Sequence, residues 1–175
     1  MNLFILSLIH QEIAEAMIDK HVSKILLEAV QMLCTALHVL EPGVHNGIYR
    51  LAHKNHPVTI WCRTSQTNFE WTLQLVDCLH AEWQYRYKHN KVHKSYVMAQ
   101  YLKEHVPDIS CFPQKGLTRF ALAMPEEYKT EDPVESYRQY YKSKRPIASW
   151  KNRMPPRWFS KYYLPCNFPN STSSG

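Results

Sequence analysis

The stretch DKHVSKILLEAVQML, residues 19–33, decides the fold that this sequence predicts. Its apolar residues recur at intervals of three and four, which is the spacing of one face of an α-helix. A second line of residues follows the same spacing, and all of its members are polar: His21, Lys24, Glu28, Gln31 and Thr35. One interpretation is a solvent face with an ordinary Lys24–Glu28 ion pair. The other is a half-buried functional site, because apolar residues flank the polar line on both sides.

Helical patterns also fill most of the chain around this stretch. We expect its helix to run from about residue 11 to residue 40, where Pro42 ends it. A second helix is expected over residues 57–87, broken between residues 64 and 68, and a third over residues 95–106. Only 4 of the 175 residues are glycine, which argues against the many tight turns of a β-sandwich or barrel.

Signals near the two ends complete the predicted architecture. The apolar segment LFILSLI, residues 3–9, is too short to span a membrane, so we expect it to be extended and buried. Asp132 is a good N-cap, and Pro133 suits the first position of a fourth helix. The sequence therefore predicts an all-α protein with a single compact helical domain over residues 1–163. This domain carries a basic, aromatic-rich C-terminal flank, and a disordered tail is expected over residues 164–175.

The positive charge of the chain is concentrated near its C-terminus. The net charge is +6, and residues 136–175 hold eight Lys or Arg residues but no Asp or Glu. This asymmetry indicates a polyanionic partner, in the first place nucleic acid, while a solvated basic flank is the simpler alternative. The aromatic residues among these cations would either stack on unpaired bases or pack the flank onto the core. The five dispersed cysteines are typical of the reducing cytoplasm.

A polar loop before the second helix is a further candidate site. The residues HKNH, 53–56, lead into a helix N-terminus, where phosphate groups bind favourably. The alternative is a zinc site built on His53 and His56, but no second closely spaced ligand pair accompanies them. Glu82 and Arg86 have the spacing of a structural ion pair. The residues that we expect to contact nucleic acid, with double-stranded DNA as the partner, are Lys20, Lys54, Asn55, His56, Arg86, Lys144, Arg145, Lys151, Arg153, Arg157 and Trp158.

Several short motifs together resemble a family of small proteins found in phages. They include MNLFILS, DKHVSKILLEAVQML, HKNHPVTIW, EWQYRY, AMPEEY and SYRQYYKSK, and the resemblance extends over nearly the whole chain to Phe159. The order of features is more distantly similar to the pyrimidine-dimer DNA glycosylases of the endonuclease V type. This similarity rests on the NLFILS start, on Asp19 and His21 in an Asp-x-His step, and on Glu28 seven residues after the histidine. The basic, aromatic end of the chain is similar as well.

This resemblance implies a compact helical enzyme that cuts the glycosidic bond at damaged pyrimidines and needs no cofactor or metal. Its nucleophile would be an amine, and its catalytic residues would be Met1, His21, Lys24 and Glu28. Glu28 would stabilise the sugar cation and move protons, while His21 would orient the substrate or contact a phosphate. In the family a small second residue lets the initiator methionine be removed. Here Asn2 usually leaves Met1 in place, so the amine of Met1 or of a lysine would have to serve.

Two other functions stay open on the sequence alone. One is a nucleic-acid-binding accessory protein without catalytic activity, whose binding depends on salt and yields no product. The other is a metal-dependent nuclease built on His53, His56 and an acid, which a chelator would inhibit. In each case we expect a phage-encoded protein in the cytoplasm of the host, without a membrane partner.

Overall fold

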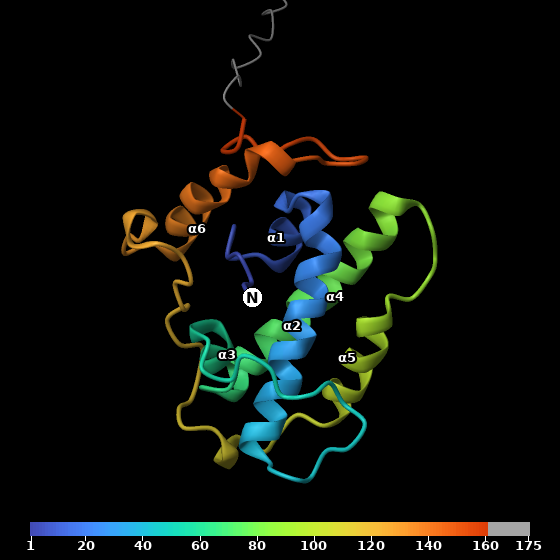
Figure 1. Ribbon diagram of the computed structural model, residues 1–175, viewed down its shortest axis with the longest axis vertical. Coiled ribbons are helices and arrows are strands. Elements are labelled where there is room, and N and C mark those ends of the chain that lie inside the picture. Colours follow the sequence, from blue (N-terminus) through green and yellow to red (C-terminus); the bar gives the residue numbers. More distant parts are fainter. Residues whose placement is uncertain (161–175) are drawn as a thin grey trace, which may run out of the picture.

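The computed structural model describes residues 1–160, which fold into helices joined by loops, without a β-strand (Figure 1). The prediction of an all-α fold is confirmed. The elements in chain order are α1 (His10–Ala16), α2 (Asp19–Leu40), α3 (Pro57–Cys62), α4 (Gln66–Tyr87), α5 (Lys94–Glu104), the 3₁₀ helices η1 (Ile109–Cys111) and η2 (Glu126–Tyr128), α6 (Pro133–Tyr141) and η3 (Lys142–Ile147). The last residues of the predicted domain, 161–163, and the predicted tail, 164–175, lie outside the described part of the chain.

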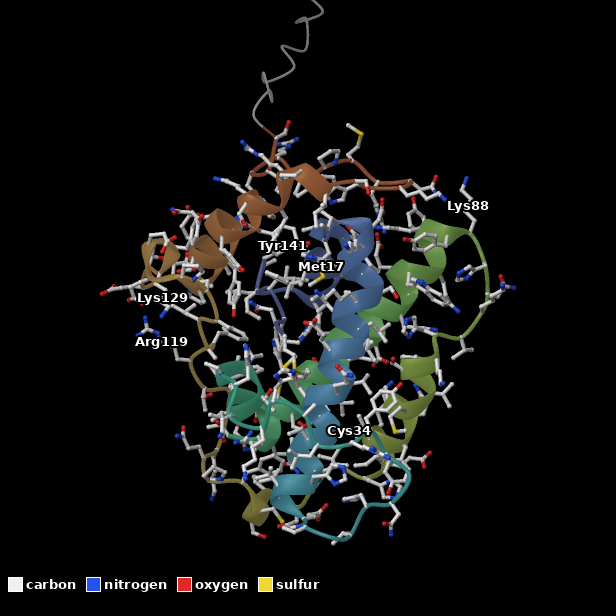
Figure 2. The ribbon with its side chains drawn as sticks, viewed as in Figure 1. Met17, Cys34, Lys88, Arg119, Lys129 and Tyr141 are labelled. Atoms are coloured by element: carbon white, nitrogen blue, oxygen red, sulfur yellow. The ribbon has the colours of Figure 1, made fainter. Side chains whose placement is uncertain are left out.

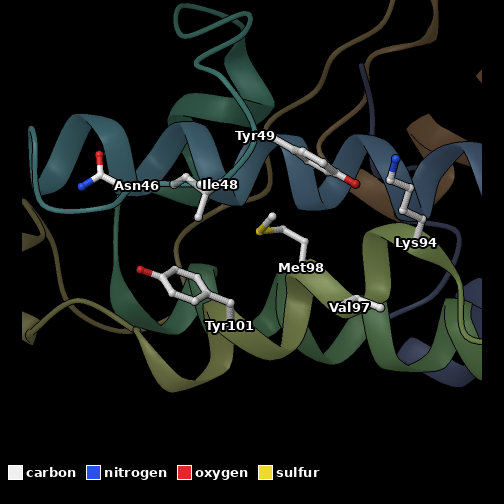
Figure 3. A pocket seen from close by; sticks show the side chains of 8 residues that line it. Asn46, Ile48, Tyr49, Lys94, Val97, Met98 and Tyr101 are labelled. Atoms are coloured by element: carbon white, nitrogen blue, oxygen red, sulfur yellow. The ribbon is translucent and has the colours of Figure 1, made fainter.

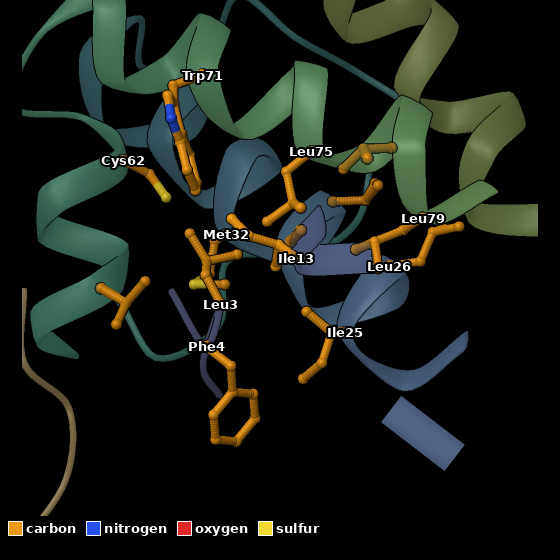
Figure 4. Close-up of a cluster of buried hydrophobic side chains, with 14 of the residues drawn as sticks. Leu3, Phe4, Ile13, Ile25, Leu26, Met32, Cys62, Trp71, Leu75 and Leu79 are labelled. Carbon is orange, nitrogen blue, oxygen red and sulfur yellow. The ribbon is translucent and has the colours of Figure 1, made fainter. Parts of the chain in front are cut away.

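The long helix α2 runs through the middle of the molecule and packs against α3, α4 and α5, while α1 packs against α4 (Figure 1). The apolar face of α2 joins side chains of α1, α4 and the N-terminal segment in one hydrophobic core (Figure 4). Members of this core include Leu3, Ile13, Ile25, Leu26, Met32, Leu75 and Leu79. By length and composition α2 is apolar enough to cross a membrane, but most of that stretch is buried inside the fold. Its periodicity is therefore that of a core helix.

The N-terminal segment is buried between residues 2 and 7, as predicted, but Leu8 and Ile9, which the prediction also included, are exposed just before α1. The side chain of Asn2 makes hydrogen bonds at the start of this segment. Its side-chain oxygen accepts a hydrogen bond from the Leu3 N–H (2.9 Å), and its side-chain nitrogen donates to the carbonyl oxygen of Ala123 (2.8 Å). Phe4 has a φ of 49°, in the left-handed region that residues with side chains rarely adopt. The contact with Ala123 holds the start of the chain against that distant segment.

The single helix expected over residues 11–40 is in fact two helices, α1 and α2, with a turn between them. Side chains from distant parts of the chain stabilise this turn. Arg86 of α4 donates to the carbonyl oxygen of Glu15 (2.9 Å), and the indole N–H of Trp150 donates to that of Ala16 (3.0 Å). The two donors satisfy carbonyl groups that the end of a helix leaves without a partner. Local periodicity does not reveal this break, because both donors come from other elements.

The other predicted helix ends agree with the structure to within about two residues: the helix expected over residues 95–106 is α5, which ends at Glu104. Local caps account for two of the helix starts. The expected break within residues 57–87 separates α3 from α4, where the Ser65 hydroxyl accepts a hydrogen bond from the Asn68 N–H (3.1 Å). Asp132 caps α6 by accepting from the Val134 N–H (2.8 Å), and a proline occupies the first position of that helix. Short polar side chains at these positions satisfy N–H groups that would otherwise lack a partner.

The C-terminal flank folds back over the start of α2 (Figure 1). The Asp19 carboxylate accepts hydrogen bonds from the Lys151 N–H (2.9 Å) and from Arg86 (3.0 Å). Phe159 is buried, and Trp150 contacts it with ring centroids 4.8 Å apart. Of the two roles left open for the aromatic residues of the flank, these two residues therefore pack the flank onto the core.

Candidate functional site

The first residues of the chain meet the polar line of α2 at Glu28. The Asn2 N–H donates to Glu28 Oε2 (2.9 Å), and the α-amine nitrogen of Met1 lies 3.9 Å from the same oxygen. The other carboxylate oxygen, Oε1, lies 3.6 Å from Lys24 Nζ. Only 13% of the Glu28 side chain is exposed. One shielded carboxylate therefore lies between an α-amine and a lysine.

These groups line a pocket of about 320 Å³ beside α2. The N-terminal segment, α2, the loop before α3, the chain at residue 123 and the end of α6 with η3 all contribute to it. The lining residues are Met1, Asn2, Phe4, His21, Lys24, Ile25, Glu28, His56, Ala123, Tyr140 and Lys144. The pocket brings together all four residues predicted to be catalytic and two of the predicted nucleic-acid contacts, His56 and Lys144.

His21 is held in this pocket as a neutral ring. It is 5% exposed and stacks on Phe4, with ring centroids 5.0 Å apart and an interplanar angle of 11°. Its Nδ1 lies 2.8 Å from the hydroxyl oxygen of Tyr141, which reaches from α6 into the interior (Figure 2). Burial, followed by the charges of nearby lysines with Lys24 first, lowers the pKa of His21 to about 4. Near pH 7 the ring is therefore uncharged. It can contact a substrate or phosphate, as the sequence predicts, through a hydrogen bond but not through a positive charge.

The loop before α3 contributes His56. Its Nδ1 accepts a hydrogen bond from the Val58 N–H (3.2 Å) and so caps α3. Burial, followed by the charge of the N-terminal amine, lowers the pKa of His56. The preceding residues of the loop, Lys54 and Asn55, are exposed to solvent.

The alternative zinc site in this region is not assembled. His53 is exposed, whereas His45 is buried and its Nε2 lies 2.6 Å from a Glu41 carboxylate oxygen. Cys62 is fully buried, and burial raises the pKa of its thiol to about 12. Over residues 1–160, no three His, Cys, Asp or Glu side chains come together in a way that could hold a metal ion. The structure therefore does not support the metal interpretation of the loop.

Most of the residues predicted to contact nucleic acid are accessible. The exposed ones are Lys20, Lys54, Asn55, Arg145, Lys151 and Arg157. Lys144 is half-buried in the pocket, with its Nζ 4.5 Å from the centroid of the Tyr140 ring. Six of the eleven predicted contacts are thus exposed to solvent, and His56 and Lys144 line the pocket.

Three of the residues predicted to contact nucleic acid are not freely exposed. The prediction for Arg86 is wrong, because the side chain is fully buried and donates from Nε to Glu82 (2.6 Å) as a structural ion pair. Arg153 is half-buried and donates to the same Glu82 carboxylate (2.9 Å), so its charge is already paired. Trp158 is half-buried, and the Arg138 guanidinium lies 5.4 Å from its ring centroid. Neither Arg153 nor Trp158 is the freely exposed contact that the sequence suggested.

Several residues of the site were not predicted from the sequence. Phe4, Ala123 and Tyr140 line the pocket, and Tyr140 lies nearly parallel to Phe4 with ring centroids 6.1 Å apart. Tyr141 supports His21 from outside the pocket lining. No local signal marks these residues, because Phe4, Ala123 and Tyr140 lie on three segments that are far apart in the sequence.

Two further cavities lie away from Glu28. One, of about 390 Å³, lies between residues 46–49 and α5 and is lined mainly by apolar side chains such as Ile48, Val97 and Met98 (Figure 3). The other, of about 770 Å³, lies between α1, the N-terminal segment, α6 and the C-terminal flank. Two glutamates and three arginines line it, together with apolar side chains such as Leu6, Met154 and Trp158. Neither cavity contains any of the residues predicted to be catalytic.

The pocket at Glu28 thus combines an α-amine, a shielded carboxylate, a neutral imidazole and two lysines. Such groups can attack an electrophilic carbon, accept a proton, donate a hydrogen bond and hold an anion. No family model, no curated protein and no solved structure matches this chain.

Proposed function

We propose that this protein is a DNA glycosylase with abasic-site lyase activity, with an N-terminal amine as nucleophile and Glu28 as proton acceptor. One observation carries the proposal: the α-amine nitrogen of Met1 lies 3.9 Å from Glu28 Oε2 inside a pocket. A free amine beside a carboxylate is the pair of groups that imine chemistry requires.

The proposed reaction has two steps. In the first, the amine nitrogen bonds to C1′ of a damaged nucleotide, the bond from C1′ to the base breaks, and its electron pair leaves with the base. Glu28 takes the proton that the nitrogen loses. In the second step, Glu28 returns its proton to the ring oxygen O4′, the bond between C1′ and O4′ breaks, and the sugar opens to a protonated imine. Glu28 then accepts a proton from C2′, the electron pair of that bond expels the 3′ phosphate, and the DNA strand breaks. Water then hydrolyses the imine and frees the amine.

The lysines of the pocket have supporting roles in this proposal. Lys24 is exposed and pairs with Glu28. We therefore propose that it orients the Glu28 carboxylate and binds a nearby phosphate of the DNA. Lys144 would hold a second phosphate. A nucleotide must leave the base stack to reach an amine inside a pocket, and damaged or weakly paired bases leave it most readily. Pyrimidine dimers in double-stranded DNA are therefore the substrate that we would test first.

Borohydride trapping tests the proposal directly. The full chain, tagged at its C-terminus so that the N-terminus stays native, is mixed with UV-irradiated or undamaged duplex DNA in the presence of a chelator. Borohydride then reduces any imine to a stable protein–DNA adduct. We expect an adduct on irradiated DNA, and we expect Glu28→Gln to form it roughly 100-fold more slowly or worse. Glu41→Gln is the matched control, because Glu41 lies at the far end of α2 and pairs with His45.

Peptide mapping of the adduct identifies the amine. We expect the first residue of the mature chain; if Met1 is removed in the cell, that residue is Asn2, whose nitrogen lies 2.9 Å from the same Glu28 oxygen. One extra residue at the N-terminus should abolish the adduct. An adduct on Lys24 would overturn the assignment of the nucleophile. No adduct, with salt-sensitive DNA binding intact, would instead identify a nucleic-acid-binding protein without catalytic activity.

A further inference from the structure

The hydroxyl group of Tyr141 lies between two polar groups at the start of α2. The Ile18 N–H donates to its oxygen (3.1 Å), and the same oxygen lies 2.8 Å from Nδ1 of His21. A hydroxyl has one hydrogen to donate. Because the Ile18 N–H is a donor, the Tyr141 hydrogen has Nδ1 as its acceptor. His21 therefore carries no hydrogen on Nδ1.

The opposite arrangement would be unfavourable. If Nδ1 carried a hydrogen, the Tyr141 oxygen would accept two hydrogen bonds, and its own O–H would have to find another acceptor. Tyr141 is fully buried, and a buried donor without an acceptor is destabilising. The neutral ring of His21 thus has its single N–H at Nε2.

The surroundings of His21 keep this ring in one orientation. Phe4 covers one face of the imidazole at a centroid distance of 5.0 Å, and Tyr141 meets the ring edge-on, at 5.3 Å and 70°. His21 lines the same pocket as Met1 and Glu28. Its Nε2–H is therefore the hydrogen-bond donor that the ring can offer to a molecule bound there.

We propose that His21 acts as a neutral hydrogen-bond donor to a carbonyl oxygen of the departing base, and that Tyr141 is the positioning residue that fixes its tautomer. This inference rests on the proposed glycosylase function. When the bond between C1′ and the base breaks, the electron pair moves onto the base, and negative charge develops on its carbonyl oxygen. The Nε2–H stabilises that charge while keeping its proton. Because the ring stays neutral, it leaves the Met1 amine and Glu28 as the groups that exchange a proton.

A spectroscopic experiment tests the tautomer without any need for activity. Long-range ¹H–¹⁵N NMR spectra of the full-length, ¹⁵N-labelled protein at pH 7 distinguish a protonated from an unprotonated ring nitrogen. We expect His21 to carry its hydrogen on Nε2 alone, and Tyr141→Phe to give a mixture of both tautomers. The matched control is Tyr101→Phe, which removes a similar Tyr–His hydrogen bond, to His45 (3.0 Å), in a part of the fold that does not line the pocket. A hydrogen on Nδ1 of His21 in the wild type would overturn the proposal.

Kinetics test the role of the donor. In single-turnover cleavage of irradiated DNA, we expect His21→Leu to lower the rate roughly 100-fold, within the range for losing one donor to a developing oxyanion. His21→Gln, which keeps an N–H donor but cannot titrate, should recover most of that loss. Tyr141→Phe should lower the rate roughly three- to tenfold, the effect of one misplaced neutral hydrogen bond. Equal rates for His21→Leu and the wild type would contradict the proposal.

A binding experiment separates this inference from the glycosylase proposal. If the wild type forms no adduct, the glycosylase proposal fails, and a duplex that contains a tetrahydrofuran abasic analogue is then added to the labelled protein. A shift of the His21 Nε2–H resonance would show that His21 donates a hydrogen bond to bound DNA. The role as donor to a departing base would then fail together with the glycosylase proposal. An unmoved resonance would overturn the role of His21 as well.

Discussion

At the scale of single residues, the neutral state of His21 makes the fold sensitive to acid. Burial and the nearby lysines lower its pKa to about 4 in the folded protein, from an ordinary value of 6.5. Between these two pH values the unfolded chain binds a proton at this residue and the folded protein does not. The contribution of His21 to stability is therefore fully present above about pH 6.5 and is lost as the pH falls towards 4.

Because only the unfolded chain binds a proton at His21, we expect the free energy of unfolding to fall by up to about 3 kcal/mol between pH 7 and pH 4 on account of this residue. Urea unfolding at pH 7 and at pH 4.5 measures the loss in the wild type and in His21→Gln, which cannot titrate. The other histidines with a lowered pKa are present in both proteins and contribute equally. The wild type should lose roughly 2 kcal/mol more than the variant over this interval. Equal losses would show that another group is responsible.

At the scale of helices, the junction of α1, α2 and α4 depends on a buried cluster of charges. Arg86 and Glu82 are fully shielded from solvent, and Arg86 also reaches Asp19 (3.0 Å) and the last carbonyl groups of α1. Arg153 brings the C-terminal flank to the same Glu82 carboxylate (2.9 Å). One guanidinium thus ends a helix, joins two others and helps to anchor the flank through Glu82.

Arg86→Met should therefore lower the free energy of unfolding by roughly 3 to 5 kcal/mol, because it leaves the Glu82 carboxylate with less compensation in a buried site. Urea unfolding at pH 7 measures the change. Adding Glu82→Leu to Arg86→Met should recover part of the loss, since the uncompensated charge is then gone. Lys151→Met is the control for an exposed cation and should change stability by less than about 0.5 kcal/mol. A loss below about 1 kcal/mol in Arg86→Met would show that the cluster does not stabilise the junction.

The same elements show why part of the fold could be predicted from the sequence and part could not. The gap between α3 and α4 and the start of α6 are encoded by caps within a few residues, Ser65 and Asp132. The break between α1 and α2 is encoded by Arg86 and Trp150, which reach it only when the chain has folded. Sequence periodicity describes a helix face, and it carries no information about a donor that arrives from another element.

Some residues of the candidate site could likewise be predicted from the sequence, and others could not. His21, Lys24 and Glu28 could be predicted because they repeat along one face of α2. Ala123 and Tyr140 could not, because they reach the pocket from segments about one hundred residues away. Their positions depend on how the N-terminal segment and α6 pack, which no local pattern describes.

At the scale of the whole molecule, positive charge gathers around the pocket. The charges of Lys20 and Lys24 in α2 and of Lys144 in η3 all lower the pKa of His21. Lysines from two elements therefore lie near the His21 ring. Glu28 is the one acid that lines the pocket, as far as the described residues extend. An anion approaching this face would therefore be attracted towards the amine and Glu28.

This distribution predicts how DNA binding should depend on salt. Each phosphate that a lysine neutralises releases counterions and adds about 0.9 to the slope of log affinity against log salt. Fluorescence anisotropy with an undamaged duplex at several salt concentrations measures this slope. Lys144→Gln should reduce the slope by about 0.9 and weaken binding equally for all sequences, because a phosphate contact carries no sequence information.

Lys129→Gln is the matched control for this measurement. Lys129 follows η2, pairs with Glu126 and does not line the pocket, so its replacement should leave the slope unchanged. If Lys144→Gln leaves the slope at the wild-type value, Lys144 contacts no phosphate, and the pocket does not face the DNA backbone on that side. If both variants reduce it equally, the slope reports net charge rather than a binding face. Only a loss confined to Lys144→Gln would locate the DNA at the pocket that contains the amine.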